Sequence, residues 1–380
     1  MDNPRAVINL ANLSHNIKQI KAHAPNSKIL AVIKADAYGH GATDIGLYLD
    51  SDKNISAYGV SRYSEAKKLI DAKVKKPILL MEGVFNYEQL INSIKYNFWM
   101  VVQSIDQLKL LLDLKKNKPD DFKPINVWLK FDTGMHRLGF KLENIDIDID
   151  YLLSQIQDLI NSKIISANVV IMSHFACADD LSHALNNKQL EEFTYIKNKF
   201  TANEFVNFEY SMANSAGIFA WPNSHDDWVR PGISMYGSSP FANKTSLELN
   251  LKPTMQMLSK IIAIKSIKQN DSVGYGAIWV ALKDSTIAII AHGYADGYPR
   301  TSLNNPFVYL KNNKCPIIGR VSMDMLAIDC TDLKNKPILG DTVELWGDNI
   351  NIDEAARSCN TISYELFTQI TSRVVKGYIK

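Results

Sequence analysis

Lys34 is the residue whose surroundings most strongly suggest chemistry. It follows the apolar run 28–33 and precedes small residues and the glycines Gly39 and Gly41. A lysine at the end of a buried strand is partly desolvated, and desolvation favours the neutral amine, which is the nucleophilic form. Such an amine can form a Schiff base. The alternative, a lysine whose ammonium extends from a strand end into solvent, is equally compatible with these residues.

Three further side chains could take part in a reaction, but each could also have a purely structural role. Arg230 could pair with the nearby carboxylates Asp226 or Asp227. His174 follows an expected strand, where a histidine more often has a structural role. Tyr275 stands between two glycines, as a tyrosine packed in a hairpin would. The residue types alone leave both interpretations open for each of the three.

These residues must be positioned by the elements of a large domain. Short apolar runs recur through the first 240 residues and alternate with segments of helical spacing such as 105–114. Runs that are apolar on both faces are typical of strands buried on both sides. Eight of them over about 240 residues predict a (β/α)8 TIM-type barrel, and a doubly wound open sheet is the competing fold. The expected strands are 28–33, 55–60, 77–81, 98–102, 125–129, 168–172, 206–210 and 233–236.

The pattern changes after Pro240. Strand-like runs follow one another without long helical partners, and turn signals such as Asn312-Asn313 separate them. We therefore predict two domains, a barrel over residues 1–240 and a mostly antiparallel β domain over residues 241–380. The expected elements of the second domain are strands at 255–264, 286–291, 307–310, 316–318, 325–328 and 342–345 and helices at 352–357 and 363–375.

Composition excludes several classes of protein. Forty-two Lys and Arg against 40 Asp and Glu leave a formal charge of +2, too weak for the clustered positive charge of nucleic-acid or membrane-surface binding. The four cysteines form no CxxC pair, which argues against a disulfide scaffold or a thiolate zinc site. We expect no metal site, no membrane span and no secretion signal, and a cytoplasmic location.

The chain resembles the alanine racemases, pyridoxal-phosphate (PLP) enzymes of fold type III. Nine segments in both predicted domains follow the order of this family. The resemblance implies a PLP-binding barrel followed by a β domain, and the interconversion of L- and D-alanine. The segments are VIKADAYGHG (32–41), KFDTGMHRLG (130–139), SHFA (173–176), NSA (214–216), RPGI (230–233), GYG (274–276), GYADG (293–297), GRVSMD (319–324) and SYE (363–365).

The resemblance also assigns the reacting groups. Lys34 would bind PLP covalently and act as one base, and Tyr275 from the second subunit of a homodimer would be the other. Two opposed groups are needed because one base cannot easily reach both faces of a planar carbon. Arg230 would face the pyridine nitrogen of PLP, and His174 would hydrogen-bond this arginine. Because an arginine only donates, the nitrogen would stay unprotonated and the cofactor a weaker electron sink.

The remaining roles concern the phosphate, the substrate and the entrance. Arg137 and the backbone N–H of Met323 would contact the substrate carboxylate, and Arg137 would also touch the phenol oxygen of the cofactor. Lys130 aligns with a lysine that is often carbamylated, and Tyr294 and Asp324 resemble residues that narrow the substrate entrance. The residues that match phosphate-binding positions of the family are Tyr38, Ser215, Gly232, Ile233 and Tyr364.

Two other functions stay open at this point. A PLP decarboxylase for basic amino acids shares the two-domain plan but calls for an acidic partner where Arg230 stands. A PLP carrier of the single-barrel kind lacks a second domain, whereas about 140 residues follow the barrel here. As a racemase, the enzyme would supply D-alanine for peptidoglycan or allow its catabolism.

Overall fold

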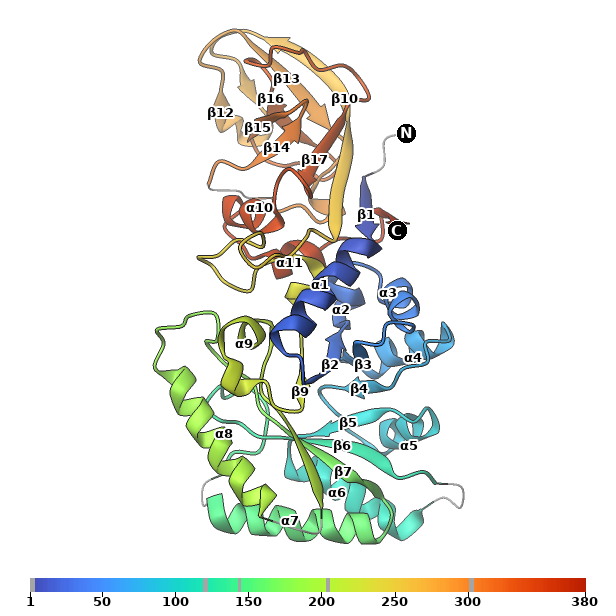
Figure 1. Ribbon diagram of the computed structural model, residues 1–380. Helices are drawn as coiled ribbons and strands as arrows, with labels where there is room; N and C mark the ends of the chain where they lie inside the picture. Colours follow the sequence, from blue (N-terminus) through green and yellow to red (C-terminus); the bar gives the residue numbers. More distant parts are fainter. Residues whose placement is uncertain (1–3, 119–121, 143–144, 203–205, 301–303) are drawn as a thin grey trace.

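Two bodies stand end to end in the molecule, a barrel of strands and helices and a smaller body built mainly of strands (Figure 1). The computed structural model describes residues 4–118, 122–142, 145–202, 206–300 and 304–380. Within these residues, no helix combines the length and the apolar character that crossing a membrane requires.

Eight parallel strands form the sheet of the first body, in the order β8-β7-β6-β5-β4-β3-β2-β9. The Arg230 N–H donates to the Ala213 carbonyl (2.9 Å), which links the ends of β9 and β8. The predicted barrel is confirmed, and the open-sheet alternative is wrong. The strands are β2 (Lys28–Val32), β3 (Ile55–Val60), β4 (Ile78–Leu80), β5 (Trp99–Val102), β6 (Ile125–Lys130), β7 (Ile165–Met172), β8 (Asn207–Ser211) and β9 (Trp228–Val229).

The barrel interior is filled by side chains, as expected for a barrel of eight strands. Seven of the eight strands contribute to one buried cluster in which Trp128 and Trp228 pack edge to face, with ring centroids 5.2 Å apart. This packed centre fixes the strand ends that carry the candidate residues. The cluster consists of Leu30, Ala57, Leu79, Val101, Trp128, Val170, Met172 and Trp228.

Helices cover the outside of the barrel. Their starts are set by capping side chains: Asn86 accepts the Gln89 N–H (2.9 Å) and Ser104 accepts the Gln107 N–H (3.3 Å). The helices are α1 (Leu10–His23), α3 (Ala42–Leu49), α4 (Tyr63–Asp71), α5 (Tyr87–Lys95), α6 (Ile105–Leu114), α7 (Ile145–Asn161), α8 (Leu185–Thr201) and α9 (Ser215–Ala220). The short element α2 (Lys34–Tyr38) is instead a left-handed turn in the wall of a cavity.

The eighth predicted strand, 233–236, is wrong. Ile233–Tyr236 is a buried 3-10 helix, η3, and the eighth strand is β9, just before it. The Met235 N–H donates to the Gly232 carbonyl (3.0 Å), and the Tyr236 hydroxyl donates to the Val32 carbonyl (3.0 Å). A short apolar run that is buried on all sides has no periodicity that separates strand from helix, which explains the error.

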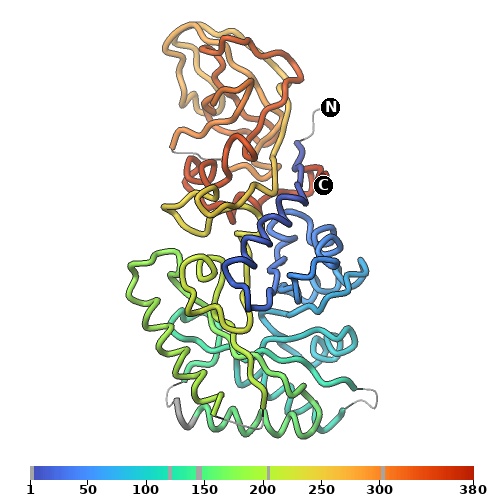
Figure 2. The backbone as a smooth tube through the Cα atoms, in the orientation of Figure 1, coloured from blue at the N-terminus to red at the C-terminus, as the bar shows by residue number. Residues whose placement is uncertain are grey.

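The second body contains an eight-stranded sheet in the order β13-β16-β15-β14-β17-β10-β1-β18, in which β13 also pairs with β10. The first strand of the chain, β1, joins this sheet and lies parallel to the last, β18, so the two ends of the chain meet there (Figure 2). Its members are β1 (Arg5–Asn9), β10 (Met255–Ile267), β13 (Ser285–Ile290), β14 (Phe307–Leu310), β15 (Asn313–Ile318), β16 (Leu326–Asp329), β17 (Thr342–Trp346) and β18 (Val375–Ile379).

Smaller elements complete the second body. A two-stranded hairpin, β11 (Ser272–Val273) and β12 (Trp279–Val280), carries Tyr275 between its strands, and α10 (Ile352–Ser358) and α11 (Ser363–Thr368) lie next to the barrel (Figure 1). The predicted helix 363–375 is wrong beyond Thr368, because its last residue, Val375, begins β18. The edge of β1 offers that segment a strand partner, and such long-range pairing overrides local helical spacing.

Candidate active site

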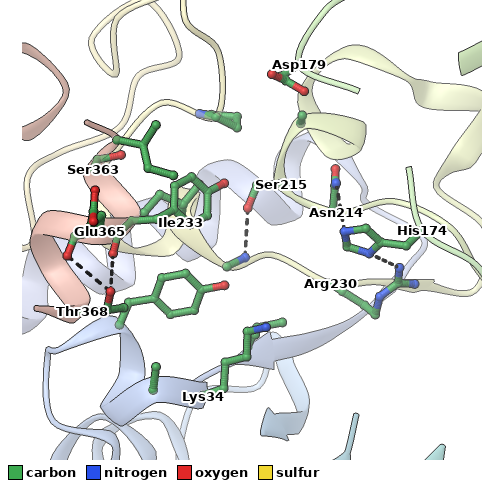
Figure 3. A pocket seen from close by; sticks show the side chains of 18 of the residues that line it. Lys34, His174, Asp179, Asn214, Ser215, Arg230, Ile233, Ser363, Glu365 and Thr368 are labelled. Atoms are coloured by element: carbon green, nitrogen blue, oxygen red, sulfur yellow. Dashed lines mark hydrogen bonds between the residues drawn. The ribbon is translucent and has the colours of Figure 1, made fainter. Parts of the chain in front are cut away.

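A cavity of about 890 Å³ opens between the carboxyl ends of the barrel strands and the helices α10 and α11 of the second body (Figure 3). In a (β/α)8 barrel this end of the strands is where active sites form. Ten of the predicted site residues line this cavity: Lys34, Tyr38, Lys130, Arg137, His174, Ser215, Arg230, Gly232, Ile233 and Tyr364.

Lys34 comes two residues after the last residue of the barrel strand β2 and is half-buried in the cavity wall. Burial lowers the pKa of its amine, the charge of Arg137 lowers this pKa further, and Glu82 and Glu65 oppose these effects. A lysine whose pKa is lowered has more neutral amine at a given pH, which is the form that attacks a carbonyl or removes a proton.

The backbone immediately after Lys34 is unusual. Ala35, Asp36, Ala37 and Tyr38 have φ values of 50°, 56°, 53° and 52°, so four consecutive residues with side chains are left-handed. Such a conformation costs roughly 1–2 kcal/mol per residue. Contacts with neighbouring parts of the fold must therefore stabilise this turn. Because the turn runs from Lys34 to Tyr38, its conformation sets how these two side chains lie relative to each other.

Arg230, at the end of β9, is held by four hydrogen bonds on its two terminal nitrogens. Nη1 donates to the Ser211 hydroxyl (2.5 Å). Nη2 shares its two hydrogens among three acceptors, which are the Ser173 carbonyl (2.6 Å), the Met212 carbonyl (3.2 Å) and Nδ1 of His174 (3.2 Å). The third nitrogen, Nε, is buried and has no partner among the described residues. Burial lowers the pKa of Arg230 to about 10, so the guanidinium stays charged at neutral pH.

The structural explanation of Arg230 as half of an ion pair does not hold. Asp226 pairs with Lys197 (2.6 Å), and Asp227 accepts the Tyr210 N–H (2.8 Å). His174 is the predicted partner of Arg230, and the two residues do meet (Figure 3). Burial and the charge of Arg230 lower the pKa of His174 well below its usual value, so this ring is neutral.

A second group of polar atoms gathers around Ser215, the first residue of α9. Its hydroxyl accepts the N–H of Gly232 (2.9 Å). A Cβ on Gly232 would lie 2.6 Å from the Tyr38 hydroxyl, so this close approach requires glycine. Backbone N–H groups and hydroxyls packed in this way are suited to binding an anion such as phosphate.

Tyr38 and Tyr364 come from different bodies and complete this group of polar atoms. We call Tyr38, Ser215, Gly232 and Tyr364 together the anion cradle. Tyr38 comes from the barrel and Tyr364 from α11, and their ring centroids are 5.9 Å apart. Burial raises the pKa of Tyr38 to about 12, and burial also raises the pKa of Tyr364. Both phenols therefore keep their protons at neutral pH and remain hydrogen-bond donors.

Lys130 and Arg137 add positive charge to the lining of the cavity. Lys130, the last residue of β6, is 6% exposed, and its pKa falls to about 8 because of burial, then the charges of Arg137 and Arg230. Asp132 opposes this shift, but its carboxylate accepts the N–H groups of Gly134 and His136 (3.0 Å each). A buried lysine in this environment therefore holds far more neutral, reactive amine at pH 7 than an exposed lysine does, and about half of it is neutral at pH 8.

Four predicted site residues lie outside the cavity. All four belong to the second body: Tyr275, Tyr294, Met323 and Asp324. The side chain of Tyr275 is 68% exposed and that of Met323 is 52% exposed. The Ala295 N–H donates to the Met323 carbonyl (2.9 Å), so the Tyr294 and Met323 segments are neighbours. Within a single chain the fold therefore does not bring Tyr275 to Lys34.

The sequence prediction missed the four acidic residues of the cavity wall, which are Glu82, Asp179, Asp353 and Glu365. Glu82 lies just beyond β4, and its charge acts on Lys34. Its position just after a barrel strand could have indicated this, because residues at the carboxyl ends of barrel strands line the active site. Asp353 of α10 accepts the Ser238 hydroxyl (2.5 Å) and the Ser239 N–H (2.9 Å), and no local pattern links residues so far apart in the chain.

Comparison with known proteins gives one family along the chain. The sequence patterns described as "Alanine racemase, N-terminal domain" and "Alanine racemase, C-terminal domain" match residues 8–240 and 254–378. An alanine racemase of Vibrio atlanticus is 41% identical over 99% of this chain and 99% of its own. The crystal structure of the biosynthetic alanine racemase of Pseudomonas aeruginosa is similar with a TM-score of 0.90 at 36% identity, and covers 100% of both chains. The alanine racemase of Bartonella henselae, described with covalently bound pyridoxal phosphate, gives 0.87 at 30% identity, again over 100% of both chains. With cavity, fold and sequence in agreement over its whole length, this chain belongs to the alanine racemase family.

Proposed function

We propose that this protein is a PLP-dependent alanine racemase that works as a homodimer with shared active sites. One observation carries the proposal: the half-buried Lys34 and the buried Arg230 line the same cavity, and the Nε of Arg230 has no hydrogen-bond partner among the described residues. The first group suits covalent attachment of the cofactor, and the second suits a hydrogen bond to its ring nitrogen.

The residues present fit PLP. A buried donor without a partner needs an acceptor, and an unprotonated pyridine nitrogen is one. Tyr38, Ser215, Gly232, Ile233 and Tyr364 would hold the phosphate, and Arg137 would hold the phenol oxygen. When bound, PLP takes up the electron pair that a proton leaves behind at Cα.

The decarboxylase alternative requires a carboxylate in the place of Arg230. Both nearby carboxylates, Asp226 and Asp227, are bonded to other groups. An arginine at the ring nitrogen limits how far negative charge spreads into the cofactor, which favours return of a proton to Cα over other reactions. We therefore favour racemisation.

Proton transfer is the work of two residues in this proposal. The amine of Lys34, with its lowered pKa, holds or removes a proton on one face of Cα. Tyr275 of the partner subunit holds or removes a proton on the other face. The hairpin that carries Tyr275 presents exposed apolar side chains, including Ile278 at 57%, and an exposed patch of this kind is typical of an interface.

Substrate binding uses the remaining predicted residues. Arg137 and the backbone N–H of Met323 of the partner subunit would bind the carboxylate of alanine. A carbamate on Lys130 would turn one of two neighbouring cations into an anion that orients Arg137. Tyr294 and Asp324 of the partner subunit would narrow the entrance.

Two further expectations complete the proposal. We propose a cytoplasmic enzyme that supplies D-alanine for peptidoglycan or allows its catabolism. We also propose that the chain divides into a PLP-binding barrel over residues 1–240 and a β domain over residues 241–380.

The test is direct. The purified protein should bind PLP and turn yellow, borohydride should fix PLP to Lys34 in a tryptic peptide, and L-alanine should yield D-alanine. Carbon dioxide release from lysine, ornithine or arginine without racemisation would make the protein a decarboxylase. Binding of PLP without turnover would make it a carrier.

A further inference from the structure

Glu65, a residue outside the proposed binding and catalytic groups, contacts the left-handed turn that follows Lys34. Its Oε1 accepts the N–H of Ala35 at 2.6 Å, from an element 30 residues away in the chain. We propose that Glu65 is a positioning residue: its carboxylate holds the start of this turn and thereby sets how the amine of Lys34 and the hydroxyl of Tyr38 are placed relative to each other.

The carboxylate of Glu65 is itself firmly fixed. It lies in the first turn of α4, and its Oε2 accepts the N–H groups of Ser61 and Arg62 at 2.9 Å each. Three backbone donors therefore share one half-buried carboxylate. Hydrogen bonds to a charged acceptor are stronger than those to a neutral one, so this carboxylate is a suitable anchor for an unfavourable backbone conformation.

The far end of the same turn is held by the second body. Asp36 pairs with Lys376 of β18, and the Tyr378 hydroxyl donates to the His40 carbonyl (3.1 Å). A Cβ on Gly39 would lie 2.0 Å from the Phe367 carbonyl oxygen, which shows how closely α11 packs there. These contacts act beyond Ala35, whereas Glu65 acts at the residue directly bonded to Lys34.

This arrangement has a specific consequence for cofactor binding. Right-handed or extended backbone is more favourable than left-handed backbone for alanine, so Ala35 without its partner would tend to relax. Relaxation would move Lys34 relative to the anion cradle while the other walls of the cavity stay in place. The inference rests on the proposed function, because it assumes that one ligand is held at both Lys34 and Tyr38.

Gln89 provides a matched control. It occupies the same first-turn position in α5, and its Oε1 accepts the Phe85 N–H (3.0 Å), but Phe85, unlike Ala35, does not line the cavity. Glu65→Ala and Gln89→Ala each remove a capping side chain from a barrel helix. Both variants should lower the melting temperature by similar amounts, and only the first should weaken PLP binding.

The experiment measures the dissociation constant of PLP by cofactor absorbance, together with the fraction of Lys34 that borohydride fixes. We expect E65A, and the isosteric E65Q if E65A folds poorly, to raise this constant by about tenfold or more, as loss of a charged hydrogen bond predicts. Q89A should match the unaltered protein. Equal PLP affinities in E65A, E65Q and Q89A would overturn the inference.

A second substitution separates positioning from a general loss of structure. Ala35 is exposed, and glycine adopts left-handed backbone without a steric cost, so Ala35→Gly should make the turn less dependent on its anchor. We expect A35G to restore PLP affinity in the E65Q background. A double variant as weak as E65Q would overturn the inference, whereas an unaltered protein that fails to bind PLP would refute the proposed function itself.

Discussion

Arg230 donates a hydrogen bond through Nη2 to Nδ1 of His174 across 3.2 Å, and this contact fixes the tautomer of the histidine. A guanidinium cannot accept, so Nδ1 must be the unprotonated nitrogen and Nε2 carries the proton. Because burial and the charge of Arg230 lower the pKa of His174, the ring stays neutral. The pair therefore holds the guanidinium of Arg230 in the wall of the cavity, while its Nε keeps no partner among the described residues.

Arg230→Lys should damage this unit although it keeps the positive charge. One ammonium cannot reproduce contacts to Ser211, Ser173, Met212 and His174, so we expect kcat to fall by about tenfold or more. Racemisation and PLP affinity should be measured together, with the exposed Arg5→Lys as the control. If R230K had the same kcat as R5K, the planar arrangement of N–H donors in the guanidinium would not matter for racemisation.

Gly232→Ala should weaken PLP binding because the new methyl group would meet the Tyr38 hydroxyl at 2.6 Å. Removing that hydroxyl with Tyr38→Phe relieves the contact. We expect the double variant to bind PLP better than the sum of the two single losses predicts, which a double-mutant cycle measures. Strictly additive losses would place the two residues in separate parts of the site.

Lys130 should make stability depend on pH in a defined direction. Its pKa is about 8 in the folded protein and near its usual 10.5 when unfolded, so between these values the unfolded chain binds the extra proton. Stability from this group then rises as pH rises through that window. In buffer free of carbon dioxide, the advantage of Lys130→Met in the free energy of unfolding should shrink from pH 8 to 10.5, and a constant advantage would contradict the shift.

Carbamylation of Lys130 has its own test. Its amine is neutral in a large fraction of molecules near pH 8, and neutral amines react with carbon dioxide. ¹³C-labelled bicarbonate should give a carbonyl NMR signal in the unaltered protein and none in Lys130→Met. Identical spectra of the two proteins would remove the carbamate from the proposal.

Residues fixed by local pattern were predictable from sequence, and residues fixed by distant contacts were not. Lys34 could be placed at a strand end because an apolar run stops next to it and glycines follow. The segment 233–236 is equally apolar, yet it turns into η3 because Tyr236 bonds to Val32, more than 200 residues away. Such a contact leaves no trace in local periodicity.

The same distinction applies within the site. The family motifs included ten residues that line one cavity. They gave no reason to expect a role for Glu65, which lies outside the lining and acts through an N–H 30 residues away. Similarly, β18 follows a segment of helical spacing and forms only because β1 offers an edge. The reacting groups could therefore be predicted from the sequence more readily than the residues that hold them in place.

Tyr275→Phe removes the proton donor that we place on the face of Cα opposite Lys34. General acid–base groups contribute about 10²–10⁴-fold, so racemisation of L-alanine should fall by that order. PLP affinity should change little, because the substitution leaves all the residues that we propose to hold PLP unaltered. A Y275F enzyme that exchanges the Cα hydrogen of L-alanine with solvent deuterium at the usual rate would exclude this role.

The most direct measurement of the shared two-base site mixes two inactive proteins, Lys34→Ala and Tyr275→Phe, under conditions that allow subunits to exchange. A hybrid dimer would hold one site in which Lys34 of one subunit faces Tyr275 of the other, so racemase activity should appear on mixing and should rise with the fraction of hybrids. If mass spectrometry finds hybrids and no activity returns, the amine and the phenol do not act across a subunit interface.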